Sequence, residues 1–171
     1  MSKYVIESSE SNFPSYVAIP GVFITQGFGY ALAHAWMHIP SNYWIHKYHH
    51  QYSEQSFVRP VAANTVTNTE FMIAYALPIV TGLVVFKPKV NDVWWVTMTI
   101  SATNLLIHTP AEHLNMKWMP SWMITNDKHF FHHEKNVRVH YSAPIIDWDW
   151  LLGIGQPIED KGEKKSTKNG K

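Results

Sequence analysis

The chain has 171 residues, enough for one domain with a substantial core. Its 14 Lys and Arg nearly balance its 13 Asp and Glu, so no basic surface argues for nucleic acid as a partner. The absence of cysteine excludes disulfide scaffolds, iron–sulfur clusters, thiolate-ligated haem and cysteine nucleophiles.

Three apolar segments follow a polar, acidic start that lacks the features of a cleavable signal peptide. They are Phe13–Ala33, Phe71–Phe86 and Val93–Ile107, with a charged turn, Lys87–Asp92, between the second and the third. The first is long enough to cross a bilayer, and the other two need flanking residues to do so. We therefore predict an all-α integral membrane helical bundle with about three apolar spans. A soluble helical bundle stays open, because the mean hydropathy of the whole chain is −0.19.

The expected hairpin over residues 71–107 returns the chain to one membrane face, so both histidine-bearing regions lie on that face. Eleven of the 14 Lys and Arg fall on the histidine side and three on the other. By the positive-inside rule this predicts a histidine-rich helical cap that faces the cytoplasm. We assign residues 1–158 to the membrane domain and residues 159–171 to a charged, disordered tail.

All 11 histidines lie in two stretches, residues 34–50 and 108–140. His34 and His38 form an H-x3-H pair, and the pattern H-x2-H-H occurs at His46 and again at His129. Residues spaced by three and four share one face of a helix, so each group directs its imidazoles into one pocket. This clustering predicts a metal site.

Ten histidines are too many ligands for one ion, and they suit two ions with about five each, leaving one octahedral position open. The predicted ligands are His34, His38, His46, His49, His50, His108, His113, His129, His132 and His133. We expect His140, Asp127 and Glu134 to orient ligand imidazoles from a second layer, with no catalytic residue beyond the metal ligands.

These motifs resemble the fatty acid hydroxylase/sterol desaturase superfamily of membrane-bound, histidine-ligated di-iron oxygenases. His46-Lys-Tyr-His-His and His129-Phe-Phe-His-His are similar to its histidine boxes, and Tyr141-Ser-Ala-Pro is similar to part of its C-terminal signature. The resemblance spans roughly residues 30–155. Members are generally longer, and they usually carry a further histidine near Thr67, where this chain has none.

The resemblance implies two iron ions, O2 as co-substrate, and hydroxylation or desaturation of a fatty acyl, sphingoid or sterol lipid. It also implies electrons from a donor such as cytochrome b5 and its reductase, and the endoplasmic reticulum as location in a eukaryote. A homo-oligomer stays an open option. Two other interpretations remain: a zinc-dependent membrane hydrolase, and a non-catalytic metal-binding relative of the family.

Overall fold

The computed structural model describes residues 13–51, 65–109, 114–135 and 139–153, with the side chains of residues 134 and 135 left out. In chain order the elements are α1 (Ser15–Met37), the 3-10 helix η1 (Tyr43–Ile45), α2 (Lys47–His50), α4 (Asn68–Glu70), the π-helix η2 (Phe71–Ala76), α5 (Leu77–Phe86), α6 (Val90–Ile107), α7 (Asn126–Lys135) and α8 (Trp148–Leu152). The described part contains no strand, only one isolated bridge between Met123 and Ile146. The all-α prediction is therefore confirmed for this part of the chain.

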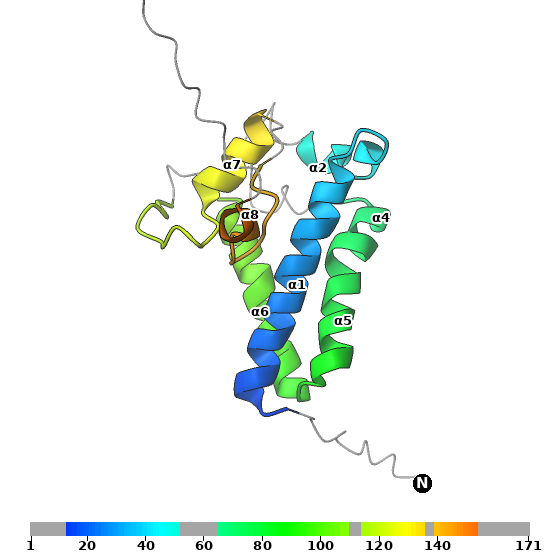
Figure 1. Cartoon of the computed structure of the whole chain (residues 1–171), viewed down its shortest axis with the longest axis vertical. Helices are drawn as coiled ribbons and strands as arrows, with labels where there is room; N and C mark the ends of the chain where they lie inside the picture. The colour runs from blue at the N-terminus through cyan, green and yellow to red at the C-terminus, as the bar shows by residue number, and fades with distance from the viewer. Residues whose placement is uncertain (1–12, 52–64, 110–113, 136–138, 154–171) are drawn as a thin grey trace, which may run out of the picture.

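Three long helical segments run side by side: α1, the continuous stretch from α4 through η2 to α5, and α6 (Figure 1). The short helices α2, α7 and α8 gather at one end of this bundle (Figure 1). At the opposite end Ser15 Oγ donates a 2.8 Å hydrogen bond to Asp92 Oδ2, which joins the starts of α1 and α6. The C-terminal ends of α1 and α6 therefore lie at the end of the bundle that carries the short helices, called the capped end below. The histidines at these two helix ends lie there as well.

The turn between α5 and α6 is shorter than the sequence pattern predicts. It comprises Lys87 to Lys89, and α6 already begins at Val90. Lys87 adopts a left-handed conformation with φ 43° at the end of α5. Asp92 lies in the first turn of α6, where a carboxylate interacts favourably with the helix dipole. The predicted charged turn over Lys87–Asp92 is thus wrong in its second half.

Close packing between α1 and α5 depends on small residues. A Cβ atom on Gly82 would lie 3.1 Å from the backbone of Val22, so the two helices touch almost backbone to backbone there. A buried cluster of Val22, Val96 and Ile100 fills the middle of the bundle. A second cluster, which includes Tyr30, Met37, Ile107 and Ile124, lies beneath the cap and supports the histidine-bearing segments.

Two helical segments are long and apolar enough to cross a membrane, Ser15–Met37 and Asn68–Phe86. In their most apolar windows only 39% and 22% of the residues are buried within the protein. A core helix of a soluble protein would be mostly buried, whereas α5 exposes Leu77, Val80 and Val84. This outward apolar surface favours a bilayer as the surroundings.

The third predicted span, Val93–Ile107, lies within α6, which is not among the described helices that are long and apolar enough to cross a membrane. The helix α6 carries Asn91, Asp92 and Asn104 among its apolar residues. Trp94 and Trp95 are largely exposed near its start, where tryptophan suits a membrane interface. The structure therefore supports two membrane helices and a third helix packed beside them.

Candidate metal centre

The first histidine group is assembled from three parts of the chain. His34 lies in the last turn of α1 and His38 directly follows that helix, His46 and His50 come from the α2 region, and His132 comes from α7. One ring nitrogen from each of these five residues lies within 4.8 Å of the others. All five side chains are buried.

The second group contains His49 from α2, His108 from the end of α6, and His129 and His133 from α7. Its four ring nitrogens also lie within 4.8 Å of one another. Nitrogens about 2.1 Å from one metal ion lie at most ~4.2 Å apart, so the spread of each group is close to that of a coordination sphere.

The two groups are neighbours. The rings of His50 and His133, one from each group, have centroids 4.7 Å apart, and those of His46 and His49 are 5.0 Å apart. Because α2 contributes His50 to one group and His49 to the other, a single short helix supplies both. The same holds for α7 with His132 and His133. The H-x2-H-H pattern thus serves two adjacent sites rather than one.

The hydrogen bonds that the Nδ1 atoms make determine which ring nitrogen carries the lone pair. His34 Nδ1 donates to the carbonyl oxygen of Tyr141 at 2.7 Å, and His132 Nδ1 donates to that of Val139 at 2.8 Å. A carbonyl oxygen only accepts, so in each neutral ring the proton is on Nδ1 and Nε2 carries a lone pair. These two Nε2 atoms lie 3.1 Å apart without a proton to share. A bound cation would satisfy both.

In the second group His108 adopts the same tautomer, with the proton on Nδ1 and the lone pair on Nε2. His108 Nδ1 donates to the carbonyl oxygen of Asn104 at 2.7 Å, which leaves Nε2 as an acceptor facing His129 Nε2 at 2.7 Å. His49 Nε2 is buried and makes no hydrogen bond within the described residues. A buried polar nitrogen without a partner destabilises the fold, and a metal–nitrogen bond removes that penalty.

Burial also keeps these rings in the form that binds metal. Removal from water lowers the pKa of His49, His129 and His133 well below the usual 6.5, and the neighbouring imidazoles lower it further. The rings are therefore neutral at pH 7. Neutral imidazole is a ligand for iron, zinc and copper, so the donor set fits a transition metal and not Mg²⁺ or Ca²⁺.

Glu70 is a functional candidate that the sequence analysis did not assign to the site. It is fully buried at the end of α4, and its Oε1 accepts a 2.7 Å hydrogen bond from His46 Nδ1. Its amide N–H donates to Thr67 Oγ1, and Thr67 Oγ1 in turn donates to the carbonyl oxygen of Ile45. A carboxylate at Nδ1 orients a ligating imidazole and increases its basicity. The signal in the sequence was an acidic residue at the border of an apolar segment.

Nine of the ten predicted ligands lie in the two groups, and the tenth, His113, falls outside the described residues. The side chain of Glu134 also lies outside them. Asp127 makes no hydrogen bond to any of the nine imidazoles in the described part, and Asp127 Oδ1 is buried without a partner there. His140 belongs to neither group; its Nδ1 lies 4.0 Å from Asp147 Oδ2.

Fold and site together define an all-helical protein with two adjacent groups of buried imidazoles at one end of an apolar bundle. The family model for fatty acid hydroxylases matches residues 19–154, which is most of the chain. The chain therefore belongs to the fatty acid hydroxylase family, within the fatty acid hydroxylase/sterol desaturase superfamily. This family consists of membrane-associated oxidoreductases. No curated protein and no solved structure matches the chain.

Proposed function

We propose that this protein is a membrane-bound di-iron oxygenase that hydroxylates or desaturates a lipid with O2 and externally supplied electrons. The observation that carries the proposal is the pair of adjacent imidazole groups, in which the lone pairs of His34 and His132 face each other. Lone pairs that face each other in a buried site repel, and a bound cation would replace that repulsion with attraction.

Iron suits the donor set better than zinc does. The first group offers five nitrogens, which leaves one position of an octahedral ion for oxygen or substrate. Zinc in proteins prefers four-coordinate sites, with three protein ligands and one open position when it is catalytic. The second group offers four nitrogens among the described residues, and His113 is the candidate for a fifth. When bound, the two irons would supply the activation of O2.

The chain's own residues would hold and shield these ions. Backbone carbonyls of Tyr141, Val139 and Asn104 keep the rings of His34, His132 and His108 in the tautomer that presents Nε2. Glu70 does the same for His46. The burial of all nine rings excludes bulk water from both sites.

A lipid substrate agrees with the location of the site at one end of exposed apolar helices. We propose that α6 completes the set of three membrane spans and that the histidine end faces the cytoplasm. A donor such as cytochrome b5 with its reductase would then deliver electrons at that face, and the endoplasmic reticulum would be the membrane in a eukaryote.

The test is the metal content of detergent-purified protein, combined with Mössbauer spectroscopy on iron-57-enriched material. About two coupled irons per chain, and oxidation of added lipids that depends on both O2 and reductant, are the expected results. One zinc per chain with O2-independent hydrolysis would replace the proposal with a membrane hydrolase. Bound iron without any lipid oxidation would identify a non-catalytic relative of the family.

A further inference from the structure

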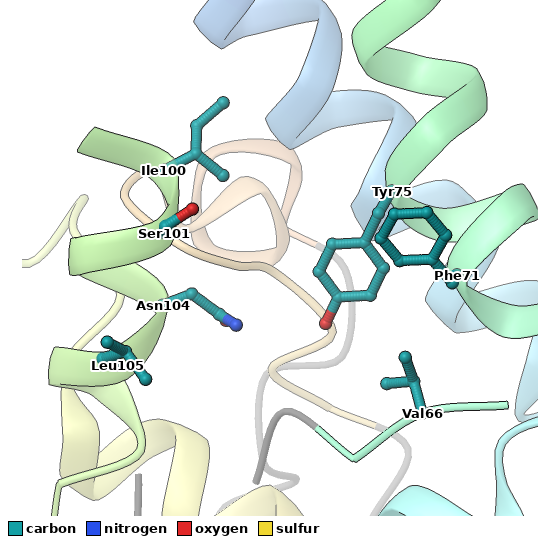
Figure 2. A pocket seen from close by; sticks show the side chains of 7 residues that line it. All are labelled: Val66, Phe71, Tyr75, Ile100, Ser101, Asn104 and Leu105. Atoms are coloured by element: carbon teal, nitrogen blue, oxygen red, sulfur yellow. The ribbon is translucent and has the colours of Figure 1, made fainter. Parts of the chain in front are cut away.

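A cavity of about 250 Å³ opens between η2 and α6 (Figure 2). Its lining residues are Val66, Phe71, Tyr75, Ile100, Ser101, Asn104 and Leu105. Asn104 connects it to the metal centre, because its backbone carbonyl accepts the hydrogen bond from His108 Nδ1. Asn104 and His108 are four residues apart, so about one turn of α6, roughly 6 Å along its axis, separates this wall of the cavity from a candidate metal ligand.

The cavity is apolar except for a small polar spot. The Tyr75 hydroxyl and the Asn104 side-chain amide both point into it, from opposite walls (Figure 2). The Tyr75 hydroxyl oxygen is buried; the Tyr30 hydroxyl and the Asn104 side chain lie near it, but within the described residues neither meets it at full hydrogen-bonding geometry. A buried hydroxyl without a well-formed hydrogen bond is costly, so a ligand group that bonds to it would gain affinity.

The charge of the lining restricts the ligand. None of the seven lining residues is a lysine, arginine, aspartate or glutamate. An ionised carboxylate or phosphate would have to leave water here without a counter-charge, which is strongly unfavourable. An uncharged oxygen, by contrast, can accept from the Asn104 amide and either donate to or accept from the Tyr75 hydroxyl.

The size of the cavity indicates which part of a lipid it can hold. Ligand pockets that enclose a drug-sized molecule are about 300–1,000 Å³. At about 250 Å³ this cavity accommodates one end of a lipid rather than the whole molecule. Phe71 and Leu105 are exposed at its margin, so a hydrocarbon chain can continue outward along an apolar surface.

We propose that this cavity binds the uncharged, oxygen-bearing end of a long-chain lipid, such as an alcohol, aldehyde or amide, with Tyr75 and Asn104 as the groups that hold the oxygen. This inference rests on the proposed function, because it identifies the substrate class of the same metal centre. It places the carbons next to the polar group closest to His108. Free fatty acids in their ionised form are excluded as the favoured ligand.

The experiment uses the full-length, metal-loaded protein in detergent and a long-chain primary alcohol that carries a diazirine for photo-crosslinking. We expect the alcohol to label peptides that contain the cavity residues, and the matching carboxylic acid to label them much less at neutral pH. Tyr75→Phe should weaken alcohol binding by about fivefold, the effect of one lost hydrogen bond. Tyr16→Phe is the matched control, because Tyr16 is exposed near the start of α1 at the far end of the bundle.

Equal labelling by the acid and the alcohol, unchanged binding in Tyr75→Phe, or labelling elsewhere in the chain would overturn the inference. If Tyr75→Phe does not fold, Ser101→Trp decides instead, since Ser101 is exposed at the margin and a large side chain there should block the cavity. Unchanged labelling of Ser101→Trp would also overturn it.

Metal content and O2-dependent oxidation are measured on the same samples. Protein with two irons that does not bind the alcohol contradicts this inference alone, whereas alcohol binding without iron contradicts the proposed function alone.

Discussion

Glu70 Oε1 lies 2.7 Å from Nδ1 of His46, and both side chains are almost fully removed from solvent. The two residues are 24 positions apart in the chain, and they meet because α4 starts beside the α2 region at the capped end of the bundle. The helix changes to π geometry directly after Glu70, over Phe71–Ala76. Single π turns within helices are frequent at functional sites, and this one follows Glu70 and carries Phe71 and Tyr75, which line the cavity.

Replacing Glu70 by alanine should weaken metal binding. The substitution removes the acceptor that orients His46, and loss of such a partner typically lowers metal affinity by about 10–100-fold. Glu70→Gln, which retains an oxygen acceptor, should give a smaller loss. Competition with a chelator of known affinity measures both effects. Asp92→Asn is the matched control, a buried carboxylate at the opposite end of the bundle, and equal metal affinity in Glu70→Ala and Asp92→Asn would contradict the assignment.

Substitutions of His132 and His133 should each affect a different metal. These residues are adjacent in sequence, but His132 belongs to the first group and His133 to the second. We expect His132→Ala and His133→Ala each to lower the metal content by about one ion per chain, with different Mössbauer signatures for the ion that remains. His140→Ala should leave the content unchanged, because His140 lies in neither group. Identical spectra for the two ligand variants would argue against two separate sites.

The metal-free protein should become less stable as the pH falls. Burial lowers the pKa of His50 and of His108 to about 4, below the ordinary value of 6.5. Between these values the unfolded chain binds more protons than the folded one, so the free energy of unfolding decreases as the pH is lowered. Thermal unfolding in detergent should therefore occur at progressively lower temperature from about pH 6.5 down to about pH 4, and change little above pH 7 from this cause. A melting temperature that rises or stays constant through this range would contradict the prediction.

Lys128→Met should destabilise the cap without removing a ligand. Lys128 Nζ donates to the carboxylate of Asp147 at 2.8 Å and to the carbonyl oxygens of Ser121 and Met123. The Asp147 side chain is fully buried, so loss of the lysine leaves its charge poorly compensated. We expect a loss of about 2 kcal/mol, measured by denaturation in detergent. Lys117→Met, at an exposed lysine, is the control, and equal stability of the two variants would show that the ion pair contributes little.

The sequence by itself determined the helical fold class and which histidines form the candidate metal centre. Apolar segments of helical length predicted the long helices, because an apolar stretch in a membrane must satisfy its backbone within itself. The H-x3-H pair and the two H-x2-H-H groups, read as helix faces, supplied eight of the nine histidines that the structure brings together, and His108 is the ninth. Local spacing was sufficient there because residues three and four apart on a helix are neighbours whatever the fold.

Only the tertiary structure decided how those histidines are divided. Sequence spacing suggested that each H-x2-H-H group forms one pocket, yet α2 and α7 each contribute to both sites, because the two helices meet at the level of His50 and His133. The roles of Glu70 and of the Tyr141 and Val139 carbonyls likewise depend on contacts between distant segments. The same is true of the cavity beside Tyr75, whose walls come from both η2 and α6. Such relationships follow from helix packing, and no local pattern of residues encodes them.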